Sequence, residues 1–372
     1  MIKISHLILH KDRGDAIIAL TVQLENKERA TIMAKIKLGQ IGIGHNHGGP
    51  KMLAARRLPE LFEVVGYSEE NPAWVEKRGN DEAYRGLTRY STEELISRCD
   101  ALLIETDVWD LTATAQKCVD AGKHIHMDKP ASGTFAEFER LLSAAKEKDL
   151  CVQMGYMYRY NPAVQWCIEK ARSGDLGEIY SINAEMSTYH NVAFKKWLTN
   201  FKGGTMYIFG SHLIDLIVYL LGEPKQVTSF LKKTQLDGVD LEDNCLSVLE
   251  YDKALARVFV SSVEVNGWGR RQFVVTGSKG SVSVLPLENR LAMTYSDLSI
   301  AGEECYQDKK IEIPMEDINN SCRYDSMMRD FYDYVTKKKQ NPFTYEHDYL
   351  VQKVLDEIIG GVDFHSHQLP TF

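Results

Sequence analysis

The chain has 372 residues, of which 44% are hydrophobic and 26% are charged, and its formal net charge is −8. This length suits two domains, and the composition is typical of a globular protein. An acidic chain without long lysine or arginine runs is a poor partner for nucleic acid or anionic membranes, so we expect neither. No apolar run approaches the roughly 20 residues that a bilayer-spanning helix needs. The seven scattered cysteines form no CxxC pair, which predicts reduced thiols in a cytoplasmic protein.

Residues 1–33 do not fit the pattern that follows them. Their apolar stretch, 16–22, is short and lacks a small-residue cleavage site, so we expect no signal peptide. Met33 stands just before the first convincing strand pattern. We therefore interpret residues 1–33 as an N-terminal extension that is either disordered or the product of a mis-assigned translation start.

Residues 34–155 alternate short apolar runs with helical patterns. The apolar runs are rich in Val, Ile and Leu, which is typical of buried parallel strands. They lie at 37–43, 63–67, 101–105, 124–127 and 151–154, and the helical patterns lie at 48–58, 92–98, 111–121 and 135–148. This alternation predicts a Rossmann domain with a doubly wound parallel sheet.

Residues 156–372 have a different rhythm. A helical pattern at 162–173 precedes longer alternating runs at 178–189, 226–232, 244–251, 254–265, 272–276 and 281–285. Gly277–Gly280 suits a hairpin turn, and 324–337 and 346–364 look helical. Long strands with few helices between them predict an α+β domain with a large, mostly antiparallel open sheet.

A glycine-rich loop follows the first strand. It reads Gly-Ile-Gly-His-Asn-His-Gly, and glycine at such a place allows a tight turn and close approach of the backbone to a pyrophosphate. The third glycine of the usual G-x-G-x-x-G spacing falls one place late. An ordinary glycine turn is the alternative. The predicted cofactor contacts are Gly42, Gly44, His45, Asn46 and His47.

An acidic pair ends the second strand. Glu69, with Glu70 as the second candidate, stands where a carboxylate would accept hydrogen bonds from the adenosine ribose. No arginine adjoins the pair in the sequence to hold a 2′-phosphate, so we expect NAD rather than NADP. Solvated glutamates at a strand end are the alternative interpretation.

Two proton-handling candidates follow. Lys129 comes after the fifth strand, at the sheet edge where ligands bind, and partial burial there would lower its pKa and let it exchange a proton with a substrate hydroxyl. His212 and Asp215 share one face of a predicted helix, and histidine is a natural proton relay. A surface lysine and a core histidine are the alternatives.

The motifs taken together resemble the Gfo/Idh/MocA oxidoreductase family from about Ile36 to the C-terminus. The resemblance lies in the glycine loop and in four further motifs, Asp-Lys-Pro at 128–130, Arg-Tyr-Asn-Pro at 159–162, Gly-Asp-Leu-Gly at 174–177 and Gly-Gly…His-Leu-Ile-Asp at 203–215. It implies an NAD-dependent dehydrogenase acting on CH–OH groups, with Lys129 and His212 as proton carriers and Thr106 and Asp128 beside the cofactor. It also implies a homodimer or homotetramer formed through the second sheet.

The sequence departs from the family pattern at several places. Asp128 replaces a glutamate, and Thr-Asp-Val at 106–108 replaces Thr-Pro-Asn. Leu111 stands where a histidine is common. Most importantly, the aspartate expected four residues before the histidine is Ile208, which cannot steady an imidazolium. Asp215 could partly take its place if the helix turns it inward.

Other polar and aromatic residues could line a substrate pocket, although each alone could be structural. They suit a polyol or an acidic sugar. The candidates are Tyr156, Arg159, His190 and Trp197. His45, His47, His124 and His126 could approach one another at two strand ends, but no carboxylate or thiolate completes the set in the sequence, so we expect no metal.

The sequence therefore predicts hydride transfer between NAD and a hydroxyl-bearing carbon of a sugar, sugar acid or cyclitol. Two alternatives remain open. One is a redox-neutral lyase, epimerase or glycosidase that acts by transient oxidation. The other is a non-catalytic nucleotide-binding sensor.

Overall fold

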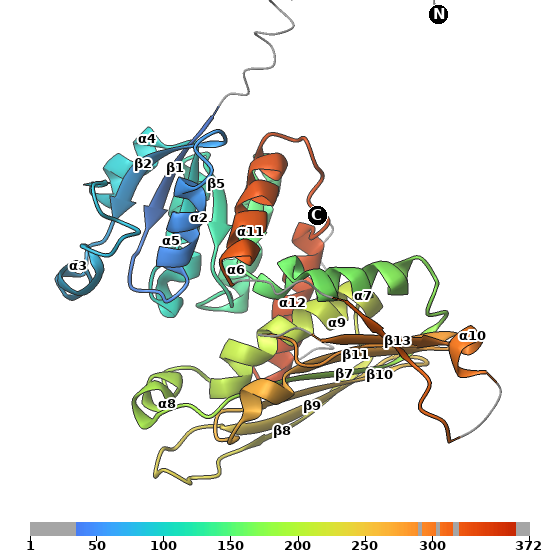
Figure 1. Ribbon diagram of the computed structural model, residues 1–372. Helices are drawn as coiled ribbons and strands as arrows, with labels where there is room; N and C mark the ends of the chain where they lie inside the picture. Colours follow the sequence, from blue (N-terminus) through green and yellow to red (C-terminus); the bar gives the residue numbers. More distant parts are fainter. Residues whose placement is uncertain (1–34, 289–291, 303–305, 315–319, 362–372) are drawn as a thin grey trace, which may run out of the picture.

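The computed structural model describes residues 35–288, 292–302, 306–314 and 320–361. The predicted N-terminal extension therefore lies outside the described residues. The described chain forms two sheets with helices between and around them (Figure 1). Within these ranges no helix is long and apolar enough to cross a membrane.

The first sheet is parallel throughout and has the strand order β3-β2-β1-β4-β5-β6. Its strands are β1 Ile36–Ile41, β2 Phe62–Ser68, β3 Thr88–Arg89, β4 Ala101–Ile104, β5 His124–Met127 and β6 Val152–Met154. Its helices are α2 Gly48–Arg56, α3 Pro72–Arg78, α4 Thr92–Arg98, α5 Leu111–Asp120 and α6 Phe135–Glu147. The reversal of strand order beside β1 opens a crevice at the carboxyl ends of β1 and β4, where such sheets bind ligands.

The second sheet has the strand order β14-β13-β12-β11-β7-β10-β9-β8, and only its β7–β10 pair is parallel. Its strands are β7 Ile179–Ser187, β8 Gln226–Lys232, β9 Asn244–Glu250, β10 Leu255–Ser261, β11 Gln272–Gly277, β12 Gly280–Val284, β13 Met293–Asp297 and β14 Ile311–Ile313. One face is apolar, as in β10, where Ala256, Val258 and Val260 are fully buried. Helices cover this face.

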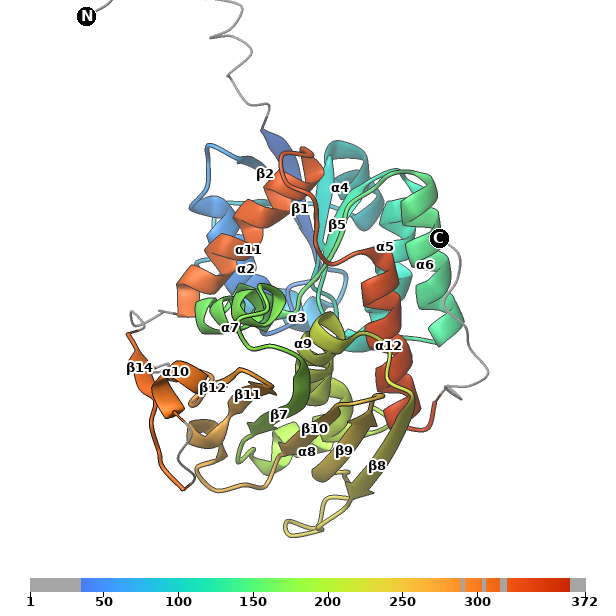
Figure 2. The same cartoon turned by 90° about the vertical axis from the view of Figure 1, so that its right-hand side faces the viewer.

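The helices of this part are α7 Pro162–Arg172, α8 Val192–Leu198, α9 Ser211–Leu221, α10 Leu298–Ala301, α11 Asn320–Val335 and α12 Tyr345–Ile358. Of these, α7, α9 and α12 contact the second sheet and lie between it and the Rossmann sheet (Figure 2). α11 packs on α2, and α12 packs on both α6 and α9. The C-terminal helices thus return to the Rossmann sheet, and one hydrophobic core runs through both parts of the molecule.

Local sequence explains several element boundaries. Thr134 forms a capping box with Glu137 at the start of α6, and Asn161 caps α7 just before Pro162. Near the end of the chain the predicted helix 346–364 is too long, because α12 ends at Ile358 and Gly360 adopts φ +69°. Residues 362–364 of that prediction lie outside the described residues.

The predicted fold class is confirmed, as is the hairpin, because β11 and β12 pair across the turn. The boundary at residues 155 and 156 stays a prediction.

Candidate active site

The glycine loop connects β1 to α2 at the crevice. Gly42 has φ +87°, and a Cβ there would lie 2.4 Å from the backbone nitrogen of Thr106, so only glycine fits. A Cβ on Gly44 would collide with the indole of Trp74. The backbone N–H groups of Gly44, His45 and Asn46 donate to no acceptor in the described chain. They are therefore free to bind an anion beside the N-terminus of α2.

A groove of about 560 Å³ lies beside this loop. Its lining includes Gly42, Glu69 and Thr106, which the sequence predicts as cofactor contacts, and Glu70, the second candidate for the ribose. Their roles in binding a cofactor stay predictions. Glu69 accepts hydrogen bonds from the backbone nitrogens of Ile43 and Asn71, at 2.9 Å each, and these contacts fix its carboxylate at the strand end.

Arg89 lines a cavity together with Glu69 and Glu70, because β3 pairs with β2. No arginine adjoins the acidic pair in the sequence, but in the folded protein Arg89 is its neighbour, so the expectation that no arginine lies beside the pair is wrong. The parallel β2–β3 pairing creates the neighbourhood, and sequence separation hides it.

A buried charge network lies between the glycine loop and the end of β5. Lys51 Nζ donates to Glu105 Oε1 and Asp128 Oδ2, at 2.7 Å each, and all three side chains are fully buried. Burial disfavours the charge on Lys51, but Asp128 and Glu105 outweigh it and raise the lysine pKa. Burial raises the pKa of Glu105. Burial also acts to raise the pKa of Asp128, but the Lys51 ammonium, together with the neighbouring His45 and His47 side chains, outweighs it and keeps that pKa well below its usual value.

Lys129 is 4% exposed and follows this network directly. Its backbone N–H donates to Asp128 Oδ1 at 2.7 Å, and its Nζ donates to the carbonyl oxygen of Ile208 at 2.8 Å. Burial lowers the pKa of Lys129 to about 8, and the cations Lys51 and Arg271 act in the same direction against Asp128. The predicted lowering of the pKa is therefore present, and a neutral amine is accessible near neutral pH.

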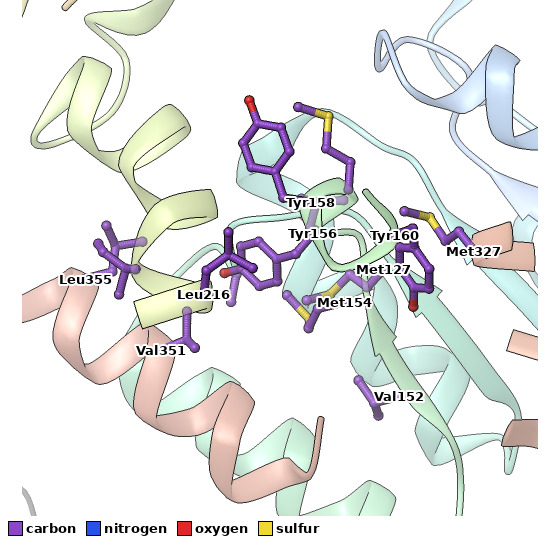
Figure 3. Close-up of a cluster of buried hydrophobic side chains, with 14 of the residues drawn as sticks. Met127, Val152, Met154, Tyr156, Tyr158, Tyr160, Leu216, Met327, Val351 and Leu355 are labelled. Atoms are coloured by element: carbon purple, nitrogen blue, oxygen red, sulfur yellow. The ribbon is translucent and has the colours of Figure 1, made fainter. Parts of the chain in front are cut away.

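His212 lies in the first turn of α9, which follows a short π-helix at Met206–Gly210. Its ring contacts those of Tyr156 and Tyr158, with centroids 5.9 and 5.3 Å away. Tyr156 immediately precedes the short 3₁₀ helix Met157–Tyr160, to which Tyr158 belongs, and the two side chains point in different directions, Tyr156 toward Leu216 and Tyr158 away from it (Figure 3). Burial and the nearby Lys129 keep the pKa of His212 well below 6.5, so its imidazole is neutral.

Asp215 does not support His212 in the described structure. It accepts a bidentate pair from Arg159, at 2.6 to 3.1 Å, and a further contact from His347 Nε2 at 2.8 Å. Asp348 is the second carboxylate on Arg159. The helix thus turns Asp215 into a buried ion network, and Nδ1 of His212 has no hydrogen-bond partner. Asp215 and Arg159 are engaged with each other rather than presented to a substrate.

The other substrate candidates, His190 and Trp197, belong to a cluster of aromatic rings. His190 stacks between Phe194 and Phe209, with ring centroids 4.4 and 5.1 Å away, and burial lowers its pKa to about 4. Trp197 packs on Phe194 and Phe201. Their roles in binding stay predictions.

The histidines do not gather as the sequence suggested. His45 and His47 approach Asp128, with Nδ1–Oδ2 distances of 3.2 and 3.0 Å, whereas His124 bonds to the backbone of Cys151. A carboxylate does therefore complete a set of three possible metal ligands, contrary to the sequence argument. The Lys51 ammonium, 2.7 Å from the same oxygen, already neutralises this carboxylate and stands against a cation there.

Sequence reasoning missed the buried ionic groups that surround these residues. Lys51 occurs one turn into α2 and looks like a solvated helix lysine, and Glu288, Arg271 and Arg323 belong to no motif. What marks these side chains as part of the site is that they are buried or nearly buried, and this shows only in the folded structure.

The crevice, the free loop amides and the strand-end carboxylate fit a dinucleotide. The pyrophosphate would be held by the amides of Gly44, His45 and Asn46, and the adenosine ribose by Glu69. The fold and this site define a nicotinamide-dependent oxidoreductase of the Rossmann type.

Comparisons with known proteins agree. Residues 36–156 match the model of the oxidoreductase family with an NAD-binding Rossmann fold, and residues 164–283 match the GFO/IDH/MocA C-terminal domain. The chain belongs to the Gfo/Idh/MocA family, and it is an NAD(P)-dependent dehydrogenase whose cofactor is NAD.

Individual relatives are distant. An oxidoreductase of Schizosaccharomyces pombe is 25% identical over 67% of this chain and 70% of its own length. The scyllo-inositol 2-dehydrogenase (NADP(+)) of Bacillus subtilis is 30% identical over 39% of this chain and 41% of its own length. Among solved structures, a levoglucosan dehydrogenase in complex with NADH and levoglucosan has a TM-score of 0.75 at 20% identity, covering 88% of this chain and 97% of that one.

Proposed function

We propose that the protein transfers hydride between NAD and a hydroxyl-bearing carbon of a sugar, sugar acid or cyclitol. The observation that carries the proposal is Lys129, a buried lysine with a pKa of about 8 at the sheet edge where the nicotinamide half would lie. The inositol and levoglucosan dehydrogenases among the relatives support this substrate range.

Bound NAD supplies the hydride acceptor. Lys129 in its neutral form accepts the proton of the substrate hydroxyl, and the carbonyl of Ile208 holds Nζ in place. His212, which is neutral and has a free Nδ1, can exchange a hydrogen bond with the same or a neighbouring hydroxyl. Asp128 keeps its charge through Lys51 and fixes the backbone that precedes Pro130.

The test is the growth of reduced-nicotinamide absorbance when the protein, NAD and a panel of sugars, sugar acids and inositols are mixed. Lys129→Ala should abolish the growth, whereas Lys253→Ala, an exposed lysine paired with Glu178, should leave it unchanged. Growth that survives Lys129→Ala would contradict the assigned role.

The redox-neutral alternative keeps one supporting observation, since Nδ1 of His212 has no carboxylate as a hydrogen-bond partner. It predicts no net absorbance change, together with exchange of a substrate C–H with solvent deuterium. Solvent exchange without net reduction of NAD would favour it over the dehydrogenase reaction.

We further propose a homodimer or homotetramer through the uncovered face of the second sheet. Phe230 and Leu255 are 49% and 55% exposed on that face, and Glu185 is buried there beside Arg257, at 3.2 Å. A sheet face that exposes large apolar side chains beside a buried carboxylate suits a self-complementary contact. A monomeric mass by light scattering would contradict it.

A cytoplasmic location fits the free cysteines of the described chain and can be tested by fractionation.

A further inference from the structure

A buried ionic cluster adjoins His212 and takes no part in the mechanism above. Glu288 is 5% exposed and lies between two arginines. Arg271 Nη1 donates to Glu288 Oε1 at 2.5 Å, and Arg323 Nη1 donates to Oε2 at 3.4 Å. The Tyr158 hydroxyl donates to the same carboxylate, and the Tyr158 ring lies against His212. The cluster is thus one side chain away from the proposed reaction centre.

The two arginines are not equally engaged. Arg271 is fixed on every side, because it also donates to the carbonyl of Ser187 and the hydroxyl of Thr188 and lies over the Trp268 ring. Arg323 lies over the Tyr324 ring, with its Cζ 5.0 Å from the ring centroid, and within the described chain it makes only two hydrogen bonds, both long, to Glu288 and, at 3.5 Å, to the Tyr324 hydroxyl. Its Nε is buried and has no hydrogen-bond partner, and only 16% of its side chain is exposed. A guanidinium has five donors, so Arg323 has donors to spare.

The charges around the cluster do not balance. Two guanidinium groups face one carboxylate, and Lys129 is close enough to Arg271 for its pKa to be lowered. Arg323 likewise acts on His212 from α11. Unpaired buried charge is costly, and a planar guanidinium matches a carboxylate in geometry as well as in charge. The imbalance therefore favours an anionic group in this position.

We propose that the substrate carries a carboxylate, which Arg323 binds while Arg271, Glu288 and Tyr158 hold that arginine and His212 in place. The inference rests on the proposed dehydrogenase function and narrows its substrate to sugar acids and other polyhydroxy acids. Neutral sugars and cyclitols leave the spare donors of Arg323 unpaired and are poorer ligands.

Matched acid and neutral probes test the proposal. The pairs are D-glucuronate and D-glucose, D-galacturonate and D-galactose, and D-gluconate and D-sorbitol. Each is titrated calorimetrically into the full-length protein with and without NADH, and each is assayed with NAD. We expect at least one acid to bind about 10- to 100-fold more tightly than its neutral partner, since one hydrogen bond to a charged group contributes on that order.

Arg323→Gln should remove this preference and leave the affinity for NADH unchanged. Arg329→Gln is the matched control, since Arg329 lies on the same helix but is 56% exposed and pairs with Glu60. Circular dichroism and the NADH titration establish that both variants fold. Because removal of Arg323 leaves Glu288 with Arg271 and Tyr158, the carboxylate is not stranded.

The outcomes separate the two proposals. Acid and neutral probes that bind alike, no bound acid at all, or a preference that survives Arg323→Gln each overturn the carboxylate site. If neutral substrates are then oxidised in a Lys129-dependent way, the dehydrogenase function stands without it. An acid preference that Arg323→Gln abolishes, without any net redox, supports the site and argues against the dehydrogenase reaction.

Discussion

Lys129 Nζ donates to the backbone carbonyl of Ile208 at 2.8 Å, at the very residue that stands where the family has an aspartate. A carbonyl accepts a hydrogen bond from either the ammonium or the neutral amine, and it adds no full charge. A carboxylate there would raise the lysine pKa, whereas the carbonyl leaves burial in control. The backbone carbonyl is present whichever side chain stands at position 208. With isoleucine there, no carboxylate at that position opposes the burial that lowers the pKa of Lys129, which favours a base that works near neutral pH.

The first prediction concerns the pH dependence of alcohol oxidation. Only neutral Lys129 can accept the hydroxyl proton, and its pKa is about 8. We expect kcat/KM for oxidation to rise about tenfold per pH unit below pH 8 and to level off above it. The reverse reduction needs the protonated amine, so its rate should be level below pH 8 and fall about tenfold per pH unit above it. Stopped-flow measurements on both directions test this, and oxidation that is flat from pH 6 to 9 would contradict it.

The second prediction compares two glycines at the cofactor loop. Gly42→Ala places a methyl group 2.4 Å from the backbone nitrogen of Thr106 at a φ of +87°, so we expect destabilisation of about 1–2 kcal/mol or more from backbone strain alone and weaker NADH binding. Gly49→Ala is the control. Its methyl meets only the Ala83 Cβ at 3.7 Å inside α2, so it should stabilise the protein by about 0.5–1 kcal/mol. Urea unfolding and NADH fluorescence measure both effects.

How far the sequence can predict this molecule is clear from particular residues. The strand and helix rhythm, the position of Lys129 after β5 and the glycine loop are local signals. Continuous apolar runs mark the strands of the first sheet, and alternating runs mark those of the second. Short elements such as α3, β13 and β14 were missed, because they have few residues and weak periodicity.

What the sequence could not supply is the pairing of distant ionic groups. Asp215 shares a helix face with His212, but it binds Arg159, which lies 56 residues earlier in the chain. Arg159 in turn binds Asp348, which lies 189 residues after it. Arg89 reaches Glu69 only through strand pairing. Such contacts depend on tertiary packing, to which spacing along the chain gives no access.

The third prediction separates a structural from a catalytic role for Asp215. Asp215→Ala leaves the buried Arg159 with a single carboxylate, Asp348, so we expect a loss of about 3 kcal/mol in the free energy of unfolding. Asp325→Ala, which breaks an exposed pair with Arg57, should cost less than about 1 kcal/mol. Chemical denaturation gives both values. Unchanged stability with lost turnover would assign Asp215 to the chemistry instead.

The fourth prediction concerns a buried carboxyl at the end of α12. Asp356 lines a cavity between the two sheets and is 9% exposed, and burial raises its pKa to about 6, against the hydrogen bond from Gln352 and the charge of Lys202. The folded state therefore binds this proton more tightly than the unfolded chain, whose aspartate has a pKa near 3.8. Below that value the carboxyl is protonated in both states, and its ionisation does not change the free energy of unfolding. As the pH rises toward 6 the unfolded chain releases the proton first, so stability falls, by up to about 3 kcal/mol at pH 7.

Asp356→Asn should then stabilise the protein by about 1–3 kcal/mol at pH 7, because asparagine keeps an acceptor for Gln352 but carries no charge. The gain should shrink steadily below pH 6 and vanish only about one pH unit below 3.8, where the unfolded aspartate is protonated as well. Asp252→Asn, at an exposed site paired with Lys225, is the control and should change stability by less than about 1 kcal/mol at any pH. Thermal unfolding from pH 4.5 to 8 measures the difference, and a gain that stays constant across this range would show that charge at Asp356 is not its cause.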